Sequence, residues 1–283
     1  MKKKDVILML GLFLSVVHFS YCQNNSDVSK KDEFVDVSKI EMKKFHLYIL
    51  AGQSNMAGRG IVEDPQGQYS ARIVVLDKNG LWKIAKDPIH FDKPEAGVGP
   101  GLAFAKEMLT TADSDVIIGL IPTACGGSPI DVWQPGGYWK QTNSHPYDDA
   151  IYRMKAAMQI GELKAVLWHQ GESDANEKLA YSYQAKLVTL IEHFRSDSGI
   201  PNLPFVAGEL HEFNSLKNQQ KDYKKIINKE LHAINLILDN YEVACVKRPK
   251  DIGDKIHFDT KSQIKIGKQY AKAIRKINRK HQN

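Results

Sequence analysis

A serine, a histidine and an aspartate lie in segments that follow strand-like apolar runs, where α/β proteins commonly place reactive side chains. Ser54 lies in GQSNMAGRG, directly after the apolar run FHLYILA. A serine hydroxyl is a poor nucleophile until a base removes its proton. His257 in GDKIHFD is the candidate base, and Asp254, three residues earlier, could hold the imidazole in the required tautomer. Each residue alone is equally typical of a turn or loop, so the prediction of acyl-transfer chemistry depends on the combination.

Acyl transfer also needs hydrogen-bond donors for the oxyanion that develops on the substrate. Gly126 and Gly127 follow another apolar run, where missing side chains let backbone N–H groups approach a substrate. Gln170 in WHQGES could add a side-chain amide, and Glu172 beside it is a second candidate for the triad acid. We favour Asp254, because an acid on the same loop as the base fits the orienting role.

Several neighbouring residues are candidates for support or substrate contact. Gln53 and Asn55 flank the serine and either brace its turn or touch substrate. Arg59 either binds substrate or pairs with a carboxylate such as Glu172. The segment DVWQPGGYWKQTNSHPY carries aromatic side chains that either stack on a sugar or pack in the core. They are Trp133, Tyr138, Trp139 and Tyr147.

The elements that must position these residues follow from the apolar pattern. Strand-length apolar runs alternate with amphipathic stretches, which indicates a parallel sheet covered on both faces. The runs are FHLYILA, ARIVVLD, DVIIGLIP, KAVLWHQ, LPFVAGEL and YEVACVK. Helices are predicted over residues 101–112, 148–161, 176–195, 216–233 and 260–278. The fold class is therefore α/β, a three-layer α/β/α sandwich whose central sheet is mostly parallel. Ligands of such sheets gather at the carboxyl ends of strands, where all the candidate residues fall.

The amino terminus predicts export. Residues 1–22 combine a Lys-rich start with a short apolar stretch, as in a secretion signal that is too short for a membrane span. Cleavage after Cys22 would release a soluble protein, and lipidation of Cys22 is the less favoured alternative. Residues 23–43 are polar and predict a leader, so the catalytic domain is expected over residues 44–283.

Composition narrows the classes of partner. The formal net charge is +6, but no basic-aromatic module accompanies it, so nucleic-acid binding is not expected. The glycines of GVGPG follow no strand and there is no P-loop, so no nucleotide cofactor is predicted. Outside the signal only Cys125 and Cys245 remain, too few for a disulfide framework or a metal motif. They either pair or stay as free thiols, and we predict no cofactor and no metal. The sequence leaves the oligomeric state open.

Five segments in order resemble the SGNH-hydrolase superfamily, a flavodoxin-like α/β/α fold. They are GQSNMAGRG, GVGPGLAFA, ACGGSPIDVW, WHQGESDA and DKIHFD. Within that superfamily they most resemble carbohydrate esterase family six, the acetyl xylan esterases, and the sialic acid O-acetylesterases. The resemblance implies Ser54 as nucleophile, His257 as base and Asp254 as acid. It also implies an oxyanion hole built from the Ser54 N–H, Gly126 or Gly127, and Gln170 in place of the usual asparagine.

The resemblance further implies a metal-independent esterase that removes acetyl groups from sugars through an acetyl-enzyme. The favoured substrate is acetylated xylan or its oligosaccharides. A sialic acid O-acetylesterase is the alternative enzyme. A catalytically inactive carbohydrate-binding relative is less favoured, because a binding protein has no need of a proton relay.

Overall fold

The computed structural model describes residues 34–63, 69–213 and 218–280. The described residues form a seven-stranded sheet in the order β3-β2-β4-β1-β5-β6-β7, in which only β3 pairs antiparallel. The strands are β1 (Phe45–Gly52), β2 (Ile73–Leu76), β3 (Trp82–Ile84), β4 (Ile117–Pro122), β5 (Glu162–His169), β6 (Phe205–Gly208) and β7 (Tyr241–Ala244). The predicted mostly parallel sheet is confirmed.

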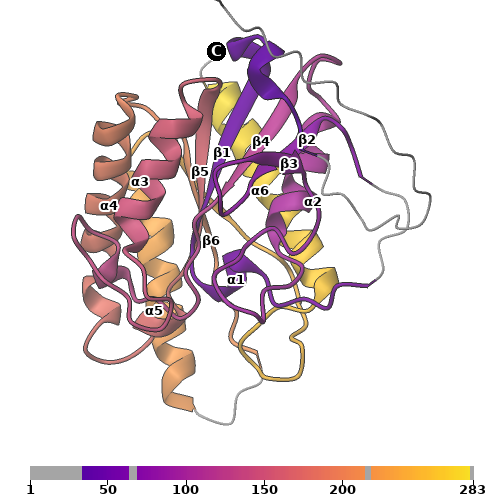
Figure 1. The fold of residues 1–283 in the computed structure, drawn as a ribbon. Coiled ribbons are helices and arrows are strands. Elements are labelled where there is room, and N and C mark those ends of the chain that lie inside the picture. Colours follow the sequence, from indigo (N-terminus) through magenta and orange to yellow (C-terminus); the bar gives the residue numbers. More distant parts are fainter. Residues whose placement is uncertain (1–33, 64–68, 214–217, 281–283) are drawn as a thin grey trace, which may run out of the picture. The chain divides into compact units, whose positions relative to one another are not determined.

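Helices cover both faces of this sheet (Figure 1). One face carries α2 (Pro100–Leu109) and α6 (Thr260–Lys280), and the other carries α3 (Pro146–Ala157), α4 (Tyr183–Ser198) and α5 (Asn218–Ala233). A single-turn helix α1 (Ser54–Ala57) follows β1. Short 3-10 helices lie at Val37–Lys39, Met42–Lys44, Ile130–Val132, Glu172–Asp174, Ala180–Ser182 and Ile234–Leu236. The predicted three-layer arrangement is therefore confirmed.

The near-continuous apolar character of the strands reflects burial on both sides. Alternate residues of β1 enter different cores: Leu47 and Ile49 pack towards α3, α4 and α5, whereas Tyr48 and Leu50 pack towards α2 and α6. Successive strand side chains point to opposite faces, so a strand with helices on both faces must be apolar at every position. This is why polar and apolar residues do not alternate along β1.

The strand order places the carboxyl end of β1 at the centre of the sheet. Counted in chain order, the parallel strands run 2-3-1-4-5-6. The flavodoxin order 2-1-3-4-5 differs by exchanging the first and third strands. Here β1 lies between β4 and β5, so the loops that follow these three strands meet at one edge. The predicted serine, glycine and glutamine segments are these three loops.

Packed structure begins before residue 44. Phe34 forms an antiparallel bridge with Lys83, the Val35 N–H donates to the Trp82 carbonyl, and Val37 is buried in the core. The last part of the expected leader thus contacts β3. The expected signal, residues 1–22, lies outside the described residues. Within the described part of the chain, no helix is both long and apolar enough to cross a membrane.

Candidate active site

Ser54, His257 and Asp254 form one continuous hydrogen-bonded relay. Ser54 begins α1, two residues after the last residue of β1, and its Oγ lies 2.8 Å from His257 Nε2. On the other side of the ring, His257 Nδ1 lies 2.5 Å from Asp254 Oδ2. The two imidazole nitrogens therefore face a hydroxyl and a carboxylate, which is the arrangement that lets a histidine take a proton from a serine.

The acid is held by its own loop between β7 and α6. The backbone N–H groups of Ile256 and His257 each donate to Asp254 Oδ1 at 2.9 Å. Partial burial opposes ionisation, but the hydrogen bonds from the His257 backbone and ring outweigh it and lower the pKa of Asp254. Asp254 thus stays ionised at neutral pH and is fixed against the imidazole.

Asn55 ties the serine turn to the loop that carries the acid and base. Its Nδ2 donates to Glu172 Oε1 at 2.5 Å and to the Ile256 carbonyl at 3.1 Å, and its Oδ1 accepts the Phe258 N–H at 3.1 Å. Glu172, the alternative acid, therefore contacts Asn55, and the carboxylate on the His257 ring is that of Asp254. The geometry favours Asp254 as the acid and gives Glu172 a supporting position.

The two glycines of the expected oxyanion hole have different surroundings. The Gly126 N–H donates to Asp92 Oδ2 at 2.9 Å, and the same oxygen pairs with Arg59 Nη2 at 2.9 Å. Gly126 is thus not a free donor, because Asp92 already occupies its N–H. The N–H groups of Gly127 and Ser54 have no hydrogen-bond partner among the described residues. The structure therefore leaves Gly127 as the available glycine of the pair.

Arg59 does not pair with Glu172. The side chains of Arg59 and Asp92 are 8% and 1% exposed, so their ion pair is almost fully removed from solvent. A Cβ added to Gly126 would lie 2.6 Å from Arg59 Nη2 and 2.7 Å from Asp92 Oδ2. A glycine is therefore required at position 126 to let the backbone approach this pair. Asp92 was missed by sequence reasoning, since nothing in HFDKPEAG marks it as part of a site.

Gln170 lies beneath the pocket and does not line it. Its side chain is fully buried, and Nε2 has three acceptor oxygens within 3.1 Å, on Gln53, Ser128 and Asp174. An amide nitrogen carries only two hydrogens, so Gln170 has none left for an oxyanion. The expected role of Gln170 as a donor is thus not supported by this geometry. The Gln170 amide instead donates to Gln53 Oε1 and so orients the Gln53 side chain.

Gln53, unlike Gln170, lines the pocket and has a side-chain amide nitrogen that is available to a substrate. Its Oε1 accepts from Gln170 Nε2 at 3.1 Å and from the Ser173 N–H at 3.4 Å. These two donors determine which end of the Gln53 amide is the oxygen. The Gln53 Nε2 has no partner among the described residues, and Gln53 lines the pocket with Ser54. Gln53 therefore supplies a side-chain N–H₂ at the position next to the serine.

The pocket over the relay is small, and most of the residues that line it are polar or charged. It has a volume of about 510 Å³, and its wall includes the cations Lys93 and Lys224 as well as the residues of the relay. A larger cavity of about 790 Å³ lies beyond β2 and β4, with Phe91 and Arg153 in its wall, but the relay does not reach it. We place the chemistry in the smaller pocket, because Ser54, His257 and Asp254 all lie in its wall.

The aromatic segment contributes mainly to packing. Trp133 and Tyr147 are both 2% exposed and belong to the core on the α3, α4 and α5 face. The Trp139 indole donates to the Gly126 carbonyl at 3.1 Å, so it supports the glycine loop from behind. Tyr138 is exposed, and none of the four aromatic residues lines the described pocket. Sugar stacking by these residues is not supported.

The comparisons with known proteins identify the family of this chain. The family model for "Carbohydrate esterase, sialic acid-specific acetylesterase" matches residues 44–276. The chain belongs to this family of carbohydrate esterases. A probable carbohydrate esterase of Arabidopsis thaliana is 31% identical over 247 residues, covering 80% of this chain and 89% of the plant protein. The resemblance to sialic acid acetylesterases is confirmed, and membership of family six stays a prediction.

Two solved structures resemble this chain over most of its length. An X-ray structure of an Arabidopsis thaliana protein has a TM-score of 0.71 and 29% identity, covering 82% of this chain and 98% of the other. NanS has a TM-score of 0.65 and 17% identity, covering 85% and 99%. At that identity NanS shows the fold alone. Together they confirm the predicted SGNH-type α/β/α fold.

Proposed function

We propose that the protein is an exported serine esterase that removes O-acetyl groups from carbohydrates. The observation that carries this proposal is the continuous relay from Ser54 Oγ through both nitrogens of His257 to Asp254, on the wall of a pocket. The carbohydrate esterase family supports the substrate class. Export rests on the signal sequence in residues 1–22, with lipidation at Cys22 as the alternative.

The proposed mechanism assigns a role to each atom of the relay. Ser54 Oγ attacks the acetyl carbonyl carbon while its proton passes to His257 Nε2, and Asp254 Oδ2 stabilises the imidazolium through Nδ1. The sugar oxygen then leaves with the proton from Nε2, and the acetyl group stays on Ser54. Water attacks this ester, again giving its proton to Nε2, and acetate departs as Oγ regains a proton.

The oxyanion donors in this proposal are the N–H groups of Ser54 and Gly127 and the Nε2 of Gln53. All three residues line the pocket, and none of these groups has a protein partner among the described residues. Loss of one such donor typically lowers kcat by about 10²–10³-fold. The variant Gln53→Ala should show a loss of this size. A wild-type kcat for Gln53→Ala would rule out this donor.

Two substrates remain to be separated. Acetylated xylan and its oligosaccharides are the substrates that the resemblance favours. Sialic acid is the second candidate, favoured by the family match and by Lys93 and Lys224 in the pocket wall, which could pair with its carboxylate. The neutral xylan fragment offers these lysines no such partner.

The test measures acetate released from acetylated xylo-oligosaccharide and from 9-O-acetyl sialic acid, by the wild type and by Ser54→Ala. Release that depends on Ser54 supports the esterase proposal, and the substrate that releases acetate identifies the class. Turnover retained by Ser54→Ala would refute the mechanism. Trapping of Ser54 by an organophosphate distinguishes an active enzyme with another ester substrate from an inactive binding relative.

A further inference from the structure

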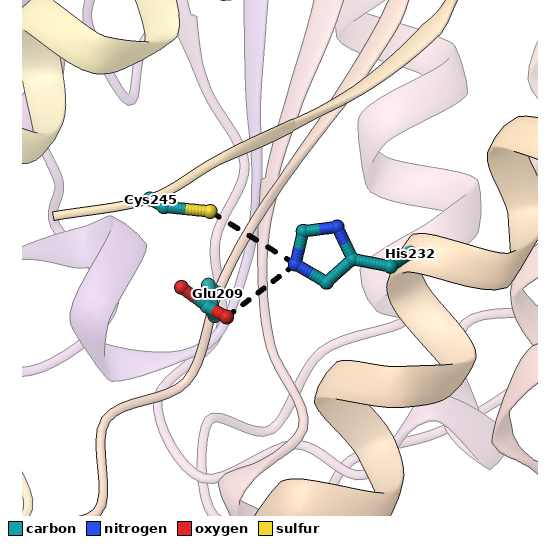
Figure 2. A group of neighbouring side chains, drawn as sticks. All are labelled: Glu209, His232 and Cys245. Carbon is teal, nitrogen blue, oxygen red and sulfur yellow. Dashed lines mark hydrogen bonds and ion pairs between the residues drawn. The ribbon is translucent and has the colours of Figure 1, made fainter.

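Three potential metal ligands converge at the carboxyl ends of β6 and β7, outside the pocket with Ser54. They are Glu209, His232 and Cys245, drawn in Figure 2. Glu209 follows β6, Cys245 follows β7, and His232 lies in the last turn of α5. The donor atoms of the three side chains all lie within 4.8 Å of one another. Three separate elements thus bring a carboxylate, an imidazole and a thiol to one point.

The backbone fixes two of these residues side by side. The register pairs Gly208 with Ala244, so Glu209 and Cys245 are the next residues along neighbouring strands. The Glu209 N–H donates to the Ala244 carbonyl at 2.9 Å and extends the strand pairing by one bond. The positions of the carboxylate and thiol are therefore set by the sheet, and only His232 approaches from a helix.

The contacts of His232 distinguish this cluster from a second catalytic triad. Glu209 Oε1 lies 3.4 Å and Cys245 Sγ 4.0 Å from the same ring nitrogen, Nε2. In a proton relay the nucleophile and the acid occupy different nitrogens of the histidine, as Ser54 and Asp254 do around His257. Here the three donor atoms instead all lie within 4.8 Å of one another, close enough to bind a single ion.

The spacing agrees with tetrahedral zinc. Zinc bonds of about 2.3 Å to sulfur and about 2.0–2.2 Å to nitrogen and oxygen place neighbouring donors roughly 3.4–3.6 Å apart in a tetrahedron. The Glu209–His232 separation of 3.4 Å meets this value, and the Cys245–His232 separation of 4.0 Å needs only a small contraction. A thiol and an imidazole select zinc over calcium or magnesium, which prefer oxygen ligands.

We propose that Glu209, His232 and Cys245 bind one zinc ion, with water completing the tetrahedron. The side chains of His232 and Glu209 are 50% and 32% exposed, so an ion can enter from solvent and keep a water ligand. The site joins the end of α5 to the ends of β6 and β7. Cys245 also begins the segment that leads to Asp254 and His257. Zinc would therefore stabilise this corner of the domain and take no part in the acetyl transfer.

Calorimetric titration of the full chain with zinc, after removal of metal with a chelator and of any affinity tag, tests the proposal. One equivalent should bind, and Cys245→Ser and His232→Gln should each weaken binding by more than the roughly 10–100-fold typical of losing an outer-shell partner. Cobalt supplies a spectroscopic probe, because a thiolate ligand gives a charge-transfer band that Cys245→Ser should abolish. Zinc should also raise the Tm of the wild type but not of these variants.

Matched controls separate this site from other thiols and from catalysis. Cys22→Ser and Cys125→Ser should keep both the zinc affinity and the cobalt band. Ser54→Ala should bind zinc normally, so the esterase proposal and the zinc proposal can fail independently. The proposal is overturned if no zinc binds up to millimolar concentration. It is equally overturned if Cys245→Ser and His232→Gln bind like the wild type, or if the cobalt band is lost with Cys22 or Cys125.

Discussion

Replacement of Asp254 by asparagine should disable the relay through the tautomer of His257. Asp254 Oδ1 accepts two backbone N–H groups, so the asparagine oxygen will take that position. The amide nitrogen must then occupy the place of Oδ2 and point an N–H at His257 Nδ1. A donor there forces the ring proton onto Nε2, the atom that must accept the proton of Ser54.

The expected loss is large because the wrong nitrogen is protonated while the loop stays intact. A triad carrying this change loses about 10⁴-fold in kcat, which corresponds to roughly 5.4 kcal/mol of transition-state stabilisation. Single-turnover release of the deacetylated sugar, which leaves when Ser54 is acetylated, measures the acylation step directly. Thermal unfolding of Asp254→Asn should match the wild type, because the two backbone hydrogen bonds to Oδ1 remain.

Glu172→Gln is the matched control for the alternative acid. The glutamine oxygen can still accept from Asn55 Nδ2, so the change replaces a hydrogen bond to a charged group by a neutral one. That difference is about 1 kcal/mol, or roughly fivefold in rate. If Glu172→Gln loses as much activity as Asp254→Asn, or if Asp254→Asn keeps more than a small fraction of the wild-type rate, the assignment of the acid is wrong.

Three further predictions follow from buried charge and backbone strain. Arg59→Met leaves Asp92 buried without its cation and should lower the free energy of unfolding by about 3–5 kcal/mol in urea titrations; the double variant with Asp92→Leu should recover much of it. Gly127→Ala should lower both stability and kcat, because φ at Gly127 is +77° and a left-handed residue costs about 1–2 kcal/mol. The control Gly80→Ala has φ of +80° and open space around it, so it should lose similar stability but keep its activity. Burial raises the pKa of Asp87 to about 7, so the folded state binds a proton that the unfolded state releases above pH 3.8. The free energy of unfolding should therefore fall as the pH rises from about 4 to 7. Thermal melts of Asp87→Asn should show a smaller fall over the same range.

The sequence predicted the parts of the fold that depend on local pattern. The apolar runs identified β1, β2, β4, β5, β6 and β7, because strands buried on both faces need no alternation. The antiparallel β3 was missed, since Trp82–Ile84 is too short to show a period. The helix predicted from residue 176 begins at Tyr183, because residues 176–182 form turns and a 3-10 helix first.

The site was predictable where one short segment carries both the residue and its partner. Asp254 and His257 lie three residues apart, so their contact follows from a single loop. The burial of Gln170, the capture of the Gly126 N–H by Asp92 and the meeting of Glu209, His232 and Cys245 depend on elements distant in sequence. Such contacts leave no periodic or motif signal, because each partner is an ordinary loop or helix residue until the sheet assembles.

The position of Asn55 explains how a serine and a histidine 203 residues apart keep one geometry. Asn55 follows Ser54 directly and bonds to the backbone of Ile256 and Phe258, the two neighbours of His257. Any movement of the acid-base loop relative to the serine must break one of these bonds. The Glu172 carboxylate accepts a hydrogen bond from Asn55 Nδ2 and so strengthens this brace. It makes no contact with the atoms that transfer the proton. Loss of Glu172 should therefore lower kcat by loosening the geometry, while the pH dependence of kcat, set by the relay itself, stays unchanged.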